Sequence, residues 1–401
     1  MVISEEMQRA LLQFPGARRA ANGGVLLPLE DGGFYHVQDI VDTSSLQGLT
    51  ADEQFFAAFC SRTEILRLRE LRNGHDYLLR LRANALVDSP RGVRVMRARR
   101  QAFETSGRPW SLSAHYHAFD AHHKSYISLL SRAHQKQLRS LPCGMAWIPE
   151  MNAMCVRSLA GDMIVASENL EHFYHFMTLG FFGADLGVPL IDQLHALLIA
   201  ARIARGSEAA DFDIDPRGQL DPPLAREIHK RVRAQMQFTF GHEFAHLLRG
   251  HLEQDDIQVT GAGEARTYAH ALEFEADEYA IRHIEHDREA RAAVASSATT
   301  VMLYLEFLNQ IADLCGMQAM ALSGSHPTPL HRLQRLHAAL GKLSPLAGAS
   351  QIDALIEHTL AMAGRMRQFV EQSPRADIMT FHGSAYLPSY RPKQLRDRID
   401  F

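Results

Sequence analysis

The clearest helix signal in this chain lies in residues 221–250. Asp221 is a good N-cap, and Pro222 and Pro223 suit the first helical positions, where backbone N–H groups have no partner within the helix. Apolar side chains then recur at helical spacing as far as residue 250. They are Leu224, Ile228, Val232, Met236, Phe240, Phe244 and Leu247. The pattern predicts one long buried helix.

The same segment contains an HExxH motif, His242-Glu243-Phe244-Ala245-His246. Residues four apart on a helix share a face, so both imidazoles can reach one metal ion. Glu243 lies beside them, where it can contact a metal-bound water. The alternative is a pair of buried histidines on an apolar helix.

A catalytic zinc ion needs three protein ligands and an open position for water. The segment Leu272-Glu273-Phe274-Glu275-Ala276-Asp277 offers the third ligand. Glu273 and Asp277 share a helical face, so Glu273 can bind the metal while Asp277 accepts a hydrogen bond from a ligand histidine and orients it. Glu275 and Glu278 are rival ligands, but neither has a carboxylate four residues later. We expect one zinc ion per chain.

With these residues in place, the chain resembles the gluzincin metallopeptidases, in particular the CAAX prenyl endopeptidases and their bacterial heat-shock protease relatives. Four blocks between about residues 152 and 336 carry the resemblance. They are His242, Glu243, His246 and His251; Glu273, Ala276 and Asp277; Ser325, His326, Pro327 and Arg332; and Asn152, Ala153, Ile164, Val165 and Leu170.

The resemblance implies a zincin-like fold and a zinc endopeptidase with Glu243 as general base. It makes His326 the first candidate to stabilise the oxyanion, although a loop-packing role is an equal alternative, and Tyr279 is the second candidate. Arg332 is expected to form an ion pair, and His251 to act as a structural hydrogen-bonding residue.

The resemblance also implies how substrate binds. A strand hairpin with Asn152, Ile164 and Val165 is expected to pair with an extended peptide by β-addition. A hairpin buried in the core is the alternative. Members of this family are often membrane-embedded or carry export signals. This chain shows neither in its sequence, so a prenylated or outer-membrane substrate does not carry over.

Composition and cysteine usage bear on the compartment. Four scattered cysteines without a CxxC pair favour a reducing environment, and Glu5 and Glu6 stand where a signal peptide is basic. The aromatic-rich residues 172–201 are interrupted by Asp185, Pro189 and Asp192. We therefore expect a cytoplasmic protein without a membrane span, whose partner is a protein or peptide substrate.

The predicted organisation is α+β and mainly helical. Residues 1–140 are expected to form a small mixed α and β module for specificity or regulation, with strands at 25–29, 35–41, 76–86 and 93–98 and a helix at 51–71. Residues 141–372 are expected to form the metallopeptidase domain, which contains the hairpin between 145 and 170. Residues 373–401 are expected to be an extended tail.

Two features support competing functions. Residues 62–100 contain eleven arginines against four acids, the pattern of a nucleic-acid surface or of solvated helix and hairpin faces. The overall net charge of −4 does not favour a polyanionic partner, and we do not expect nucleic acid. A catalytically inactive zincin-fold interaction protein is the other alternative. The chain has 22 histidines, and those at 115, 117, 122 and 123 form a cluster without metal-ligand spacing.

Overall fold

The computed structural model describes residues 5–21, 23–30, 32–37, 47–87, 89–149, 151–214, 217–254, 262–316, 327–345, 348–373 and 384–390. The chain divides into two compact units, residues 1–66 and 67–401. The boundary predicted near residue 140 therefore falls inside the second unit. The described residues are mainly helical and form two three-stranded sheets, so the predicted α+β, mainly helical class is confirmed.

The first unit contains a short antiparallel sheet with the order β1-β2-β3. Its elements are α1 (Glu5–Leu11), β1 (Arg18–Arg19), β2 (Val25–Pro28), β3 (Phe34–Val37) and α2 (Ala51–Phe56). The strand predicted at 25–29 is present as β2, and the strand predicted at 35–41 is present as β3 as far as residue 37. Residues 38–41 lie outside the described ranges. The helix predicted at 51–71 is broken between α2 and α3 (Arg62–Glu70), which carries the chain into the second unit.

The strands predicted at 76–86 and 93–98 are wrong, because these residues lie in the helices α4 (Gly74–Val87) and α5 (Pro90–Thr105). Alternating Arg and Leu suggested a period of two, but Leu, Arg and Ala are all strong helix formers. The buried positions of α4 recur at helical spacing. Ser89 caps α5 by accepting a hydrogen bond from the N–H of Gly92, and Pro90 occupies a first-turn position. What the sequence suggested as a turn is the start of a helix.

The second sheet has the order β4-β6-β5. Strand β4 (Cys143–Ala146) is parallel to β6 (Gly161–Ser167), and β5 (Ala153–Ser158) is antiparallel to β6. The predicted hairpin is therefore present, with β6 in the centre and β5 at an edge of the sheet. Helix α9 (Glu168–Phe182) follows β6 directly, and its N-cap Ser167 accepts a hydrogen bond from the N–H of Asn169.

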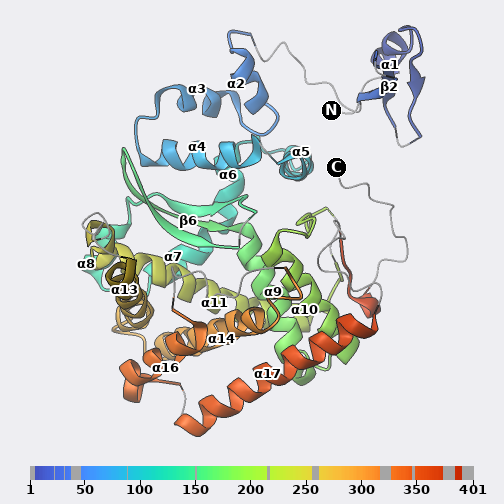
Figure 1. Ribbon diagram of the computed structural model, residues 1–401. Helices are drawn as coiled ribbons and strands as arrows, with labels where there is room; N and C mark the ends of the chain where they lie inside the picture. The colour runs from blue at the N-terminus through green and yellow to red at the C-terminus, as the bar shows by residue number, and fades with distance from the viewer. Residues whose placement is uncertain are drawn as a thin grey trace. The chain divides into compact units, whose positions relative to one another are not determined.

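The long predicted helix is α11 (Pro222–Leu248), which packs against α7, α9, α13, α14, β5 and β6 (Figure 1). Because these elements surround α11, its polar and its apolar faces are both buried near its C-terminal end. The remaining elements are α6 (Leu112–Tyr116), α7 (Ala121–Ile127), α8 (Arg132–Leu138), α10 (Leu190–Arg205), α12 (His251–Gln254), α13 (Ala262–Arg282), α14 (Arg288–Gln310), α16 (Pro329–Leu340) and α17 (Ala349–Gln372).

Short 3-10 turns complete the fold at His117–Asp120, Ala184–Leu186, Gly341–Leu343 and Pro388–Tyr390. Of the predicted tail, residues 384–390 are described and pack against other parts of the second unit. The N–H of Ser389 donates to Asp192 at 2.9 Å, and Leu387 is buried. Within the described ranges no helix combines the length and apolar character needed to cross a membrane.

Candidate metal centre

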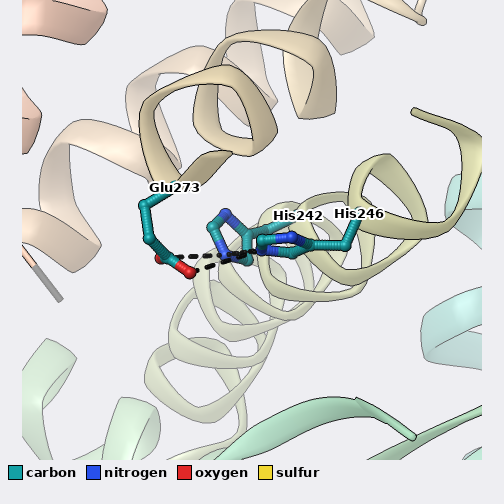
Figure 2. A group of neighbouring side chains, drawn as sticks. All are labelled: His242, His246 and Glu273. Carbon is teal, nitrogen blue, oxygen red and sulfur yellow. Dashed lines mark hydrogen bonds and ion pairs between the residues drawn. The ribbon is translucent and has the colours of Figure 1, made fainter. Parts of the chain in front are cut away.

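Helix α11 places the two histidines of the HExxH motif side by side. Their Nε2 atoms lie 3.1 Å apart, and both point away from the axis of α11 on the same face (Figure 2). His242 is buried and His246 is partly buried. The spacing of four residues on a helix therefore brings two potential nitrogen ligands to one point, as the sequence predicts.

Helix α13 packs against α11 and brings Glu273 to the same point. The carboxylate lies 3.5 Å from Nε2 of His242 and 3.5 Å from Nε2 of His246 (Figure 2). One ligand atom from each of these three residues lies within 4.8 Å of the others. Elsewhere in the described ranges, no three His, Cys, Asp or Glu side chains converge in this way.

Asp277 lies one turn beyond Glu273 and contacts the outer nitrogen of His242. The Nδ1–H of His242 donates to Asp277 Oδ1 over 2.9 Å. Arg332 of α16 donates to both oxygens of Asp277, at 2.6 and 2.8 Å, and its guanidinium lies 3.6 Å from Glu273. The predicted contact between Asp277 and a histidine is present, and so is the predicted ion pair of Arg332.

Rival ligands for the third position have other partners. Glu275 accepts a hydrogen bond from Arg249 at 2.6 Å and contacts His251 at 3.2 Å. Glu278 pairs with Arg282 on its own helix. His251 is buried beside the site, with its Nδ1 2.9 Å from Nδ1 of His246. This contact agrees with the hydrogen-bonding role expected of His251.

The electrostatics of the cluster follow from its buried carboxylates. Burial alone lowers the pKa of His242, but hydrogen bonds to Asp277 and Glu273 outweigh burial and raise that pKa to about 10. Burial disfavours the charged form of Glu273, yet the two histidines and Arg332 hold its pKa well below the ordinary value. In the metal-free cluster the carboxylates thus favour a cation at the ligand nitrogens.

This donor set fits a zinc ion. Two imidazole nitrogens and one carboxylate form a frequent set of protein ligands for catalytic zinc. Each Nε2 faces Glu273, and each Nδ1 has a partner of its own, Asp277 or His251. A proton on Nδ1 leaves the lone pair of Nε2 available to a metal.

A cavity of about 190 Å³ adjoins the cluster. Glu243 lines it together with His242, Glu273 and Arg332. Asn152 and Ala153, at the start of edge strand β5, form another part of its wall. The rest of the lining is mostly apolar and includes Leu170, Phe173, Phe238, Val301, Met302, Leu305, Pro327 and Pro329.

Other residues singled out from the sequence lie elsewhere. Ile164 and Val165 are fully buried on β6, whose two edges are already paired, so β6 cannot add a peptide strand. Tyr279 lies under the guanidinium of Arg249 at 4.2 Å and does not line the cavity. Ser325 and His326 lie outside the described residues. Of the three hairpin residues predicted to bind substrate, Asn152 lines the cavity, whereas Ile164 and Val165 do not.

Sequence reasoning missed Tyr174 and Thr239, which both line the cavity. The hydroxyl of Tyr174 lies 2.8 Å from Thr239 Oγ1, and Thr239 donates to the carbonyl of Gln235 at 3.1 Å. Burial raises the pKa of Tyr174 to about 12, although the Thr239 contact opposes the shift. Thr239 precedes Glu243 by one helical turn, a signal that was readable in the sequence. Its partner Tyr174 lies on another helix, so the sequence carries no sign of this contact.

Arginines of the basic segment are largely engaged inside the protein. Arg99 pairs with Glu168 at 2.7 Å and with Asp213, and Arg94 pairs with Asp211 at 3.1 Å. Buried Arg82 donates to the carbonyl of Met145 at 2.8 Å. These contacts use part of the charge of the basic segment within the fold.

Comparison of the chain with family models, with curated proteins and with solved structures finds no match.

Proposed function

We propose that this protein is a zinc-dependent endopeptidase. The observation that carries the proposal is the convergence of His242, His246 and Glu273 next to a cavity that Glu243 lines. Two neighbouring helices supply these side chains, and a sheet edge lies within reach of the same cavity. This combination supports hydrolysis of an extended polypeptide.

His242, His246 and Glu273 would hold one zinc ion per chain. When bound, zinc supplies Lewis acidity that activates a water molecule and polarises a carbonyl group. Asp277 holds the imidazole of His242, and the guanidinium of Arg332 balances the negative charge of Asp277 and Glu273. The site needs no ligand from a second molecule, because three protein ligands leave a position open for water.

Glu243 is the proposed general base. Its carboxylate takes a proton from the attacking water and delivers that proton to the leaving amine. It lies next to His242 on α11 and lines the cavity, so a water in the cavity can reach it. Glu243 is buried and therefore shielded from bulk solvent.

The substrate is proposed to bind along β5. This strand pairs on one side with β6, and it is an outer strand of the sheet. A peptide added to that edge in an extended conformation passes Asn152 and Ala153 at the mouth of the cavity. The apolar lining then favours a bulky apolar side chain at one subsite, because such a side chain gains by leaving water.

Tyr174 is a proposed donor to the developing oxyanion. Catalysis of acyl transfer depends on donors placed where negative charge appears. Tyr174 lines the cavity, and its hydroxyl donates to Thr239 Oγ1, because Thr239 gives its own hydrogen to Gln235. As negative charge develops in the cavity, the Tyr174 O–H would turn from Thr239 toward the oxyanion. The role that resemblance assigns to His326 stays a proposal beside it.

We further propose a reducing compartment, the cytoplasm. All four cysteines, Cys60, Cys143, Cys155 and Cys315, are described, and none forms a disulfide. The pKa of the Cys315 thiol is raised to about 12 by burial, with Arg205 opposing the shift, so this thiol is not reactive at neutral pH.

The test is the Glu243→Gln variant, which keeps the shape of the side chain and removes the base. Proteomes of cells expressing the native chain and this variant are compared for new protein termini, and both purified proteins are assayed for zinc. The proposal expects equal zinc content and termini that only the native chain produces. Glu227→Gln, an exchange at a partly exposed position on the same helix, is the matched control and should cleave normally.

If the native chain and Glu243→Gln give identical termini, the enzyme proposal is wrong and the inactive interaction protein replaces it. Zinc content distinguishes that outcome from loss of the metal site.

A further inference from the structure

The outer nitrogen of His246 has an unusual partner. Nδ1 of His246 lies 2.9 Å from Nδ1 of His251, which follows the end of α11 and is only 2% exposed. The other ring nitrogen of His251, Nε2, lies 3.2 Å from Glu275 Oε2. Glu275 in turn accepts from Nε of Arg249 at 2.6 Å. Four side chains therefore form a continuous chain that ends at the proposed metal ligand.

Hydrogen-bond chemistry permits one arrangement of protons when Nε2 of His246 serves as a ligand. Nδ1 of His246 must then carry the hydrogen and donate it to Nδ1 of His251. His251 keeps its own hydrogen on Nε2 and donates it to the carboxylate of Glu275. Each donor in the chain thus meets an acceptor.

The other ligand histidine is held in a different way. Nδ1 of His242 meets the carboxylate of Asp277 directly, and Arg332 supports that carboxylate. For His246, the imidazole of His251 lies between the ligand and the supporting carboxylate of Glu275. The two arrangements share the same end, a carboxylate paired with an arginine, and α13 supplies both carboxylates.

We propose that His251, supported by Glu275 and Arg249, is the positioning residue that sets the tautomer and ring orientation of His246 for metal binding. The inference rests on the proposed metal site and is independent of peptide hydrolysis. Hydrogen-bonding partners of this kind change metal affinity when they are removed, by about 10- to 100-fold.

Three substitutions at residue 251 separate the two contacts of the imidazole. In His251→Asn the side-chain oxygen takes the place of Nδ1, so the contact to His246 is kept. In His251→Gln the amide reaches the place of Nε2, so the contact to Glu275 is kept and the contact to His246 is lost. His251→Phe fills the space and keeps neither. His286→Phe, at a position with a largely exposed side chain, is the control.

The full-length protein is stripped of metal, and its affinity for zinc is measured by competition with a chromophoric chelator. We expect His251→Asn to stay within about threefold of the native chain, and His251→Gln and His251→Phe to bind zinc about 10- to 100-fold more weakly. Circular dichroism of the metal-free proteins checks the fold. If His251→Phe does not fold, the Asn and Gln variants decide the question.

A second readout follows the proton itself. In zinc-loaded protein with labelled histidine, the Nδ1 proton of His246 should give a protected NMR signal in the native chain and in His251→Asn, and exchange with water in His251→Gln. The inference is overturned if zinc binds the native chain and all variants equally well, or if His251→Asn binds zinc as weakly as His251→Gln. If the native chain binds no zinc, the proposed metal site is wrong. If Glu243→Gln cleaves normally, only the peptidase proposal is wrong.

Discussion

Three carboxylates on α13 lie within five residues and have three different surroundings. Glu273 faces the two ligand nitrogens, Glu275 faces Arg249 and His251, and Asp277 faces His242 and Arg332. Asp277 is the most buried of the three, and it accepts hydrogen bonds from two side chains. Its charge is therefore compensated entirely within the fold.

Asp277→Ala should be strongly destabilising. The substitution leaves the guanidinium of Arg332 buried without its main partner, which costs about 3–5 kcal/mol of unfolding free energy. Urea unfolding of the metal-free protein measures this loss. Asp162→Ala breaks the more exposed ion pair with Arg157 and should cost less than about 1 kcal/mol. Equal losses at the two positions would argue against a buried ion pair at Asp277.

Tyr174→Phe removes one hydroxyl from the cavity and little else. If Tyr174 donates to the oxyanion, kcat on a protein substrate should fall by about 100-fold while KM changes little. Zinc content should stay the same, because Tyr174 is not one of the three ligands. A variant with native kcat would assign Tyr174 a packing role instead.

At the scale of elements, α11 joins the metal site to the core. Gly241 precedes His242, and a Cβ at this position would lie 2.6 Å from the ring of Tyr126. Tyr126 stacks on Phe244, and its hydroxyl donates to the carbonyl of Ala280 on α13 at 2.8 Å. The missing side chain thus lets α7, α11 and α13 approach one another beside the ligands.

Gly241→Ala should therefore lower stability by about 1–3 kcal/mol, through overpacking against Tyr126. Gly364→Ala is the matched comparison, since Gly364 lies within α17 and a Cβ there meets open space. That exchange should raise stability by about 0.5–1 kcal/mol. Thermal unfolding of the two variants tests the pair, and the same sign for both would contradict the packing described here.

Helix α14 lines the cavity with Val301, Met302 and Leu305. Leu305 is partly exposed, so Leu305→Trp should extend into the cavity with little strain in the core. We expect cleavage of substrates with a bulky apolar residue to decrease by at least about tenfold, with zinc content unchanged. Assays with a peptide library measure the preference. An unchanged preference would show that the cavity does not receive a substrate side chain.

The predictability of these elements differed for physical reasons. Helix α11 was predictable because its caps, period and motif all agree, and the side chains of Glu273 and Asp277 followed from the same helical spacing. Helices α4 and α5 were not predictable in the same way. Arg alternates with Leu in these segments, so the same residues satisfy both the period of a strand and the period of a helix. Arg332 and His251 were indicated only by the family resemblance, and Tyr174 was missed. All three meet the site from separate elements, and tertiary packing of that kind leaves no local signal in the sequence.

At the scale of the molecule, several histidines are buried as neutral groups. Burial lowers the pKa values of His115, His123, His175 and His283 to about 4. In the unfolded chain these groups titrate near 6.5, so the unfolded state binds more protons between pH 6.5 and 4. The stability that these four neutral histidines contribute should therefore be complete above pH 6.5 and decrease as the pH falls through this window.

His123→Phe tests this dependence at one position. The ring of His123 is buried against Phe240, so Phe can occupy the same space. The pH dependence of unfolding free energy between pH 6 and 5 should decrease by about 1.4 kcal/mol per pH unit relative to the native chain. Urea unfolding at a series of pH values gives the slope. An unchanged slope would mean that His123 is protonated in the folded state as readily as in the unfolded one.

The proposed function depends on a metal ion held by α11 and α13. The most direct test is the zinc content of the purified full-length protein, measured by mass spectrometry of the metal and compared with a His246→Ala, Glu273→Ala double variant. We predict close to one zinc ion per native chain and almost none in the variant. Native protein without near-stoichiometric zinc, or a double variant that retains it, would contradict the proposed site.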